Sequence, residues 1–405
     1  MLNLDKNKKY LLACSFGPDS MALFDMLLKE KYSFEVAHVN YHLREESDFE
    51  EKSLREFCEK KKIKLHIFQN SKKFNSNVEA NCREVRYSFF ACLYKEYGFD
   101  GLLVAHNEDD LIETYLLQKR RKNLVFHYGL ASKNVIKDMV VYRPLLSWTK
   151  EKLLKYCDKE LIPYAIDKTN LQPIYLRNIL RLKTVSKMNS DERKSIIMKI
   201  SNENEKLEKI ISKVKQTSND INDLLNLSGI EFAYYLNIKL QSINIFKPIT
   251  YKQSAEIVKI LRSNKPNIAL NVCGNKATIF KSYDKLFIEK NDVAFETIIL
   301  SEPCVIDNQF LFADLINEGP KRKIKNEDYP LTIRAYQKGD KYKISNYDVP
   351  VRRLFIDWKM PLRLRKCWPL FVNKDNKIVY IPRYREDFNI NNSPNFYVKE
   401  CFTLK

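Results

Sequence analysis

The first residues whose types and spacing could do chemistry are Ser15, Phe16, Gly17, Pro18, Asp19 and Ser20, between an apolar run and a helical pattern. A loop with serine and glycine at a strand–helix junction offers backbone N–H groups and a helix N-terminus to a phosphate chain. The segment lacks the lysine of a Walker loop and the glycine spacing of a dinucleotide fingerprint. The alternative is that Asp19 or Ser20 only caps the helix.

A second group of reactive side chains follows a later apolar run and comprises His106, Asp109, Asp110 and Glu113. Asp109 and Glu113 are four residues apart and therefore share one face of a helix. Together with Asp110 they could hold an ammonium group or a Mg²⁺ ion, with Asp109 and Asp110 as the metal ligands. Acidic residues also stabilise the first turn of a helix without any ligand, so a plain helix start is the alternative.

Both groups need strands that end at the same edge of a sheet. Short apolar runs at 9–14, 34–40, 64–68 and 102–105 alternate with helical patterns at 19–29, 47–62, 78–97 and 109–120. Repeated strand–helix units predict a doubly wound parallel α/β sheet with helices on both faces. Ligands of such sheets bind beyond the carboxyl ends of the strands, which is where both groups fall.

With 405 residues, the chain is long enough for two or three domains. We expect a catalytic domain over 1–190, a helical linker and middle domain over 191–320, and a small β-rich domain over 321–405. A lysine- and glutamate-rich helix at 192–215 has little apolar surface, which suits a linker. The role of 220–320 does not follow from the sequence.

The net charge of +19 is distributed unevenly. Residues 101–200 carry 19 basic and 11 acidic residues and 321–405 carry 20 and 9, whereas 1–100 and 201–320 are nearly neutral. Two separate basic regions are typical of a protein that contacts one polyanion. A lysine-rich proteome would instead raise the charge everywhere.

Other features exclude several classes of protein. The nine cysteines include no C-x-x-C pair, which argues against a disulfide framework, a zinc ribbon or an iron–sulfur cluster. No apolar run approaches the roughly 18 residues of a membrane span, and no secretory signal is evident. We therefore expect a cytoplasmic protein.

Residues 15–20 resemble the S-G-G-x-D-S loop of the ATP-pyrophosphatase (PP-loop) superfamily. Further segments resemble one branch of it, the tRNA(Ile)-lysidine synthetases: His38–Arg44, Asn77–Tyr87, Ala105–Thr114, Arg143–Leu146, Asp167–Asn170, Arg177–Arg181, Arg334–Lys341 and Leu354–Pro369. The resemblance covers about 1–185 and 328–405. There are two departures, since Phe16 stands at the first loop glycine and Lys119-Arg-Arg-Lys122 replaces an Arg-Gly turn. If Phe16 must adopt a positive φ, the strain is on the order of 1–3 kcal/mol.

The resemblance implies a two-step reaction on the wobble cytidine of a tRNA(Ile) with a CAU anticodon. ATP adenylates the base with release of pyrophosphate, and free L-lysine then displaces AMP to give lysidine. It implies that ATP binds with Mg²⁺ at the loop, and that lysine binding and catalysis involve His106, the three acids, Arg83 and Arg86.

Several basic residues are candidates for contact with the tRNA: Arg44, Arg120, Arg121, Arg177, Arg181, Arg352, Arg353 and Lys359. Arg177 and Arg181 suit RNA phosphates or the nucleotide equally. In the tail we expect the charges to contact phosphates and Trp358 and Trp368 to pack the domain. The oligomeric state is open, with a homodimer as one option.

Two other functions are compatible with the same sequence. One is a different PP-loop enzyme of RNA modification, although the thiolases among these need paired cysteines or a cluster. The other is a catalytically dead RNA-binding relative, with Phe16 as the mark of an inactive loop. Release of pyrophosphate from ATP in the presence of lysine and tRNA distinguishes the alternatives.

Overall fold

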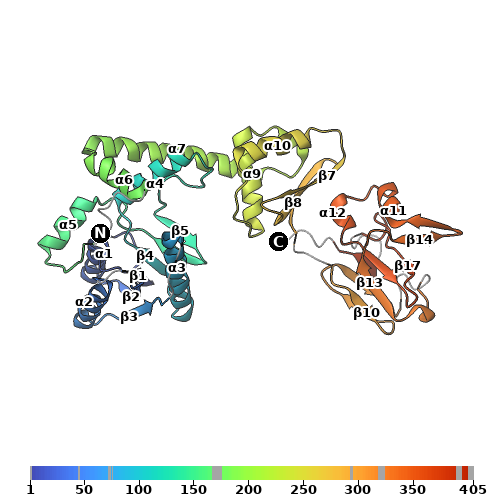
Figure 1. The fold of residues 1–405 in the computed structure, drawn as a ribbon, viewed down its shortest axis with the longest axis horizontal. Helices are drawn as coiled ribbons and strands as arrows, with labels where there is room; N and C mark the ends of the chain where they lie inside the picture. Colours follow the sequence, from blue (N-terminus) through green and yellow to red (C-terminus); the bar gives the residue numbers. More distant parts are fainter. Residues whose placement is uncertain are drawn as a thin grey trace. The chain divides into compact units, whose positions relative to one another are not determined.

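The computed structural model describes residues 2–43, 46–71, 74, 76–166, 176–291, 295–317, 324–388 and 395–399, without the side chains of 176–178. The chain divides into two compact units, Met1–Glu208 and Lys209–Lys405 (Figure 1). The division falls inside the long helix α7 (Ser190–Gln216), where the sequence predicts a charged helix. The three-domain division stays a prediction. In the described part of the chain, no helix has the length and apolar character needed to cross a membrane.

The first unit is built on a six-stranded sheet in the order β3-β2-β1-β4-β6-β5. Its strands are β1 (Lys9–Ala13), β2 (Ser33–Asn40), β3 (Leu65–Gln69), β4 (Gly101–Val104), β5 (Lys133–Ile136) and β6 (Met139–Tyr142). All pairs are parallel except β5 with β6. The four predicted strands are confirmed. The β5–β6 hairpin was not predicted, because four residues are too few for a clear alternation.

Helices cover both faces of this sheet. They are α1 (Pro18–Lys29), α2 (Glu46–Lys61), α3 (Val78–Glu96), α4 (Glu108–Arg121) and α5 (Lys150–Lys159). Successive strand residues point to opposite faces. Leu12 accordingly lies in one core with residues of α1, α2 and α5, and Leu11 lies in another core with residues of α3. The doubly wound α/β class is therefore confirmed.

The strand order reverses at β1, because β2 and β3 lie on one side of it and β4 on the other. A crevice opens at the carboxyl ends of strands at such a point. Helix α6 (Leu176–Lys183), the short helix η2 (Val185–Lys187) and the start of α7 contact α4 at this edge.

The second unit begins with α8 (Ile221–Leu225), α9 (Gly229–Ser242) and α10 (Tyr251–Leu261). An antiparallel sheet of β7 (Asn267–Val272), β8 (Ala277–Ser282) and β9 (Lys285–Lys290) follows them. The predicted middle region is thus helical in its first part and contains strands in its second.

The remainder of this unit is rich in strands. They are β10 (Ile298–Leu300), β11 (Val305–Asp307), β12 (Leu311–Asp314), β13 (Leu331–Ala335), β14 (Lys341–Ile344), β15 (Tyr347–Pro350), β16 (Pro369–Val372), β17 (Ile378–Tyr380) and β18 (Phe396–Val398), with helices α11 (Val351–Asp357) and α12 (Leu362–Arg365). Strand β10 pairs with β13 and β12 pairs with β18, so two sheets include strands from both sides of residue 320. Trp368 is 1% exposed in the core, as the predicted packing role requires.

Candidate active site

A cavity of about 1560 Å³ lies at the carboxyl ends of β1, β2 and β4. The starts of α3, α4 and α5 line it, together with residues of α6 and α7. The predicted site residues in its lining are Ser15, Gly17, Pro18, Asp19, His106, Asp109, Asp110 and Arg181. The two reactive groups of the sequence therefore meet in one cavity.

Phe16 adopts a φ of 61°, in the left-handed region. This conformation costs a phenylalanine on the order of 1–3 kcal/mol. Its side chain is 3% exposed and packs in the core under α1, and its carbonyl accepts a hydrogen bond from the Ala165 N–H at 3.0 Å. Burial of such a side chain contributes about 1.5–3 kcal/mol, enough to offset the strain. The chain therefore keeps the left-handed turn without a glycine.

The loop presents the N-terminus of α1 to the cavity. Gly17 is the N-cap residue, and no side chain caps the helix. Ser20 Oγ donates to the Gly17 carbonyl at 2.9 Å and accepts from the Ser15 N–H at 3.3 Å, which ties the loop to itself. An uncapped helix start beside a fixed loop suits a phosphate group.

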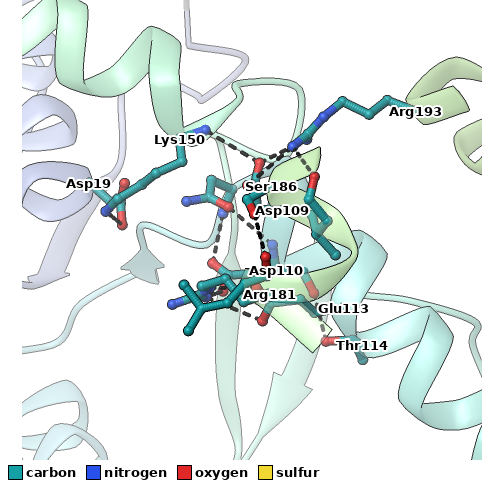
Figure 2. Close-up of polar contacts among 12 residues, drawn as sticks. Asp19, Asp109, Asp110, Glu113, Thr114, Lys150, Arg181, Ser186 and Arg193 are labelled. Atoms are coloured by element: carbon teal, nitrogen blue, oxygen red, sulfur yellow. Dashed lines mark hydrogen bonds and ion pairs between the residues drawn. The ribbon is translucent and has the colours of Figure 1, made fainter. Parts of the chain in front are cut away.

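Asp19 is the first carboxylate of α1. Its Oδ2 accepts a hydrogen bond from Lys150 Nζ at 2.7 Å, as Figure 2 shows. Its Oδ1 is buried and, within the described residues, has no hydrogen-bond partner. Burial raises the pKa of Asp19, and Lys150 opposes this shift. An unsatisfied buried oxygen is costly, so the site is arranged for a donor or cation that a ligand supplies.

The acidic group at the start of α4 is paired with Arg181 of α6 (Figure 2). Arg181 Nε donates to Glu113 Oε1 at 2.5 Å, and its Nη2 donates to Asp110 Oδ1 at 3.0 Å. Glu113 is fully buried, and a buried carboxylate requires such a partner. Arg181 therefore pairs with the acids of α4 and also lines the cavity, and its expected contact with RNA or nucleotide stays a prediction.

Arg193 of α7 holds the other side of the group. Its Nη1 donates to Asp109 Oδ1 at 2.9 Å and lies 3.1 Å from Glu108 Oε1, and its Nη2 donates to Asp109 Oδ2 at 3.3 Å. Asn107 and Asp110 form a capping box, with both hydrogen bonds at 3.1 Å. Asp110 therefore also caps the start of α4, which was the alternative role that the sequence allowed.

The pair Asp109 and Asp110 does not fit a Mg²⁺ site in this arrangement. All four of their carboxylate oxygens accept hydrogen bonds, from Arg193, Arg181 and the Asn107 N–H. Among the residues that the structure describes, no group of three or more His, Cys, Asp or Glu could hold a metal ion. Oδ1 of Asp19 is a buried carboxylate oxygen without a hydrogen-bond partner in the described residues, and it is therefore available to a cation.

Two histidines line the cavity, His38 from β2 and His106 after β4. His38 Nδ1 lies 2.9 Å from the Cys14 carbonyl oxygen, and burial lowers the pKa of its ring. His106 Nδ1 accepts a hydrogen bond from Arg143 Nε at 3.1 Å. The sequence singled out His106, but it gave no role to His38 or Arg143.

Four other arginines predicted for the first unit, Arg83, Arg86, Arg120 and Arg121, are described by the structure and are not in the lining of this cavity. Arg83 and Arg86 are exposed on α3 and are not among the described residues that line it. Arg83 instead stacks over Tyr87, with its Cζ 4.7 Å from the ring centroid. Arg120 and Arg121 are exposed at the far end of α4, about 20 Å from its start by helix geometry. Arg44 and the side chain of Arg177 fall outside the described residues, as does the segment 167–170.

The predicted residues of the second unit lie on and after α11. Arg352 and Arg353 are exposed, and Arg353 Nε is 3.9 Å from Asp357 Oδ2. Lys359 lines an open cavity of about 550 Å³ together with Tyr283, Tyr384, Arg385 and others. Their contact with tRNA stays a prediction.

Three site residues had no local signal in the sequence: Arg143, Lys150 and Arg193. Lys150 follows the N-cap Thr149 of α5, and Arg193 is one basic residue in a charged helix, so neither is distinctive. Arg143 belongs to a segment that supported the family resemblance.

Comparisons with known proteins identify the family of this chain. The model of a family described as PP-loop domain matches residues 1–188. The tRNA(Ile)-lysidine synthase of Mycoplasma mycoides subsp. mycoides SC is 34% identical over 396 residues, which cover 94% of this chain and 98% of that protein. Those of Mesoplasma florum and Lactococcus lactis are 31% and 30% identical, covering 89% and 91% of this chain and 94% and 86% of their own. The chain belongs to the tRNA(Ile)-lysidine synthase family.

Proposed function

We propose that this protein is a cytoplasmic ligase that joins free L-lysine to the wobble cytidine of tRNA(Ile) with a CAU anticodon, forming lysidine. ATP is converted to AMP and pyrophosphate in the reaction. The observation that carries the proposal is that the loop of residues 15–20 and a group of buried carboxylates line one cavity, in a chain of this family. The left-handed turn at Phe16 favours a working loop over a catalytically dead relative.

ATP binding would place the phosphates at residues 15–20, against the uncapped start of α1. Backbone N–H groups at a helix start favour negative charge, which stabilises pyrophosphate as it leaves. Mg²⁺ fits beside Asp19, whose Oδ1 lacks a partner in the described residues, and would supply charge neutralisation for the phosphates. Lys150, bound to the other oxygen of Asp19, adds a second positive charge.

Lysine binding would use Glu113 and Asp110, the carboxylates that Arg181 contacts. A guanidinium between two carboxylates occupies the kind of place that an ammonium group would take. The attacking amine must be neutral, so one amino group of lysine is held as a cation while the other reacts. In this proposal the acids of α4 select lysine and do not bind metal.

Capture of the tRNA would involve the basic surface of the second unit around Arg352, Arg353 and Lys359. These side chains are exposed, and positive side chains hold RNA through its phosphates. Arg120 and Arg121 of the first unit would make further contacts with the phosphates of the tRNA. A homodimer stays a prediction.

The direct test is incubation of an unmodified tRNA(Ile) transcript with a CAU anticodon, ATP and labelled lysine. We expect label in the RNA and pyrophosphate in equal amounts. A matched transcript with uridine in place of the wobble cytidine should take up no label. Pyrophosphate release without lysine transfer would favour a different PP-loop RNA-modifying enzyme, and no ATP turnover would favour an RNA-binding relative.

A further inference from the structure

Arg143 is a buried cation whose hydrogen-bond partners in the described chain are all neutral. It is 5% exposed, and its Nη1 donates to the Ala131 carbonyl and to Asn134 Oδ1, both at 2.7 Å. Its Nε donates to Nδ1 of His106 at 3.1 Å. Buried guanidinium groups ordinarily pair with carboxylates. Here one donor is directed at an imidazole nitrogen, which fixes where the proton of that ring lies.

The position of the proton follows from the donor. An arginine keeps its proton in proteins and can only donate, so Nδ1 of His106 accepts and the neutral ring carries its proton on Nε2. A proton on Nδ1 would set two N–H groups against each other, which also disfavours the imidazolium form. His106 lines the cavity and Arg143 does not, so the arginine binds the ring from outside the cavity lining.

His38 has the opposite arrangement. Its Nδ1 faces the Cys14 carbonyl, which can only accept, so Nδ1 carries the proton and Nε2 is an acceptor. Strands β2 and β4 flank β1 in the sheet. The loop of residues 15–20 therefore follows a strand whose neighbours are β2, which carries the acceptor His38, and β4, which the donor His106 directly follows.

We propose that Arg143 is a positioning residue that locks His106 as a neutral hydrogen-bond donor, whose Nε2–H binds a phosphoryl oxygen during adenylation and stays on the ring. The inference rests on the proposed function. In that step the base oxygen bonds to the α-phosphorus as the bond to pyrophosphate breaks, and negative charge gathers on the phosphoryl oxygens. A fixed donor stabilises this charge. His106 is not the general base, because its acceptor nitrogen is held by Arg143.

The first test reads the proton directly. The chain has five histidines, so ¹⁵N NMR of histidine-labelled protein can resolve each ring. At neutral pH we expect the Nε2–H form for His106 and the Nδ1–H form for His38, the internal control. In folded Arg143→Gln, the signal of His106 should shift towards mixed forms while that of His38 is unchanged. A His106 ring that is protonated on Nδ1 in the wild type would overturn the proposal.

The second test separates a donor from a base by activity. The amide nitrogen of glutamine can reach the place of Nε2, whereas that of asparagine lies nearer the place of Nδ1. We expect His106→Asn and His106→Ala to lose about 100-fold in pyrophosphate release, and His106→Gln to retain most of the activity. Equal losses in folded Gln and Asn variants would sink the donor role. Absence of lysidine formation by the wild type would count against the proposed function, while the NMR result would stand on its own.

Discussion

The cavity of the first unit and helix α11 of the second unit both contain arginines, but the arginines differ in how closely carboxylates pair with them. In the cavity, Arg181 and Arg193 each contact two carboxylates. On α11, Arg353 has only a 3.9 Å approach to Asp357, and Arg352 has no ion pair within the described residues. A phosphate meets little competition on α11, whereas in the cavity it competes with buried carboxylates. The same residue type therefore organises a reaction site in one region and is available to a polyanion in the other.

The largest effect should come from Asp19, which joins the loop to the charged groups of the cavity. Asp19→Asn should reduce pyrophosphate release about 100-fold or more, because it removes the carboxylate that faces the phosphates and their cation. Asp25→Asn is the control, since Asp25 lies on the same helix and pairs with Lys29 and Tyr156 outside the cavity. Normal turnover by the folded Asp19 variant would remove the phosphate-loop interpretation.

A smaller effect is expected at the paired acids. Glu113→Gln should raise the KM for lysine about 10-fold, equivalent to about 1.4 kcal/mol, while tRNA affinity is unchanged. Loss of the buried charge leaves Asp110 as the carboxylate partner of Arg181 within the described residues, so thermal stability should also fall. Glu203→Gln is the matched control. Glu203 lies on α7 and pairs with Lys119 of α4, the helix that also carries Glu113. If both variants lost only stability, the acids would serve the fold alone.

The loop could be predicted from the sequence because its features are local. The strand, the turn and the start of α1 lie within about 20 residues, and Asp19 and Ser20 fall where the pattern put them. His106, Asp109 and Asp110 could be predicted for the same reason, as they directly follow β4. Even the strained Phe16 was visible as a departure, although its φ needed the structure.

The pairing of the acids of α4 with arginines could not be predicted, because these arginines are distant from them in the sequence. Arg181 is 68 residues from Glu113, and Arg193 is 84 residues from Asp109. Periodicity cannot show that α6 and α7 return over α4. The exposed arginines of α11 and the half-buried Arg181 look alike in sequence, so only tertiary packing separates their environments.

The pH dependence of stability offers a finer test of the cavity. Burial raises the pKa of Asp19, so the folded protein holds this proton more tightly than the unfolded chain, and ionisation destabilises the fold as the pH rises. Asp19→Asn should therefore gain melting temperature relative to the wild type between acidic and neutral pH.

Glu51→Gln is the control, because the pKa of Glu51 is shifted in the opposite direction to that of Asp19. Burial alone would raise the pKa of Glu51, but hydrogen bonds from Asn40, Arg55 and Gln69 lower it below its ordinary value. That stability is present at neutral pH and is lost on acidification, so the Glu51 variant should lose melting temperature relative to the wild type as the pH rises. Parallel trends in the two variants would contradict the buried, unsatisfied state of Asp19.

The smallest effect is expected on α11, and it tests the other half of the comparison. Replacing Arg352 and Arg353 by alanine should raise the apparent KM for tRNA several-fold and leave the KM for ATP unchanged. Each lost phosphate contact should reduce the slope of log affinity against log salt by about 0.7–0.9. Both residues are exposed, and the one ion pair that the described residues show for them is the 3.9 Å approach of Arg353 to Asp357, so folding should be unaffected.

The control for this experiment is Arg383→Ala in the same unit. Arg383 is also exposed, but its Nη1 lies 2.6 Å from Glu386 Oε1, so its charge is already paired. Neutralising it changes the net charge of the protein by one without removing an available arginine. If the salt slope fell equally in both cases, the tRNA would be sensing net charge and not α11. A slope that is unchanged in the double variant would exclude these two arginines as phosphate contacts and leave Lys359 and its neighbouring cavity as the next surface to test.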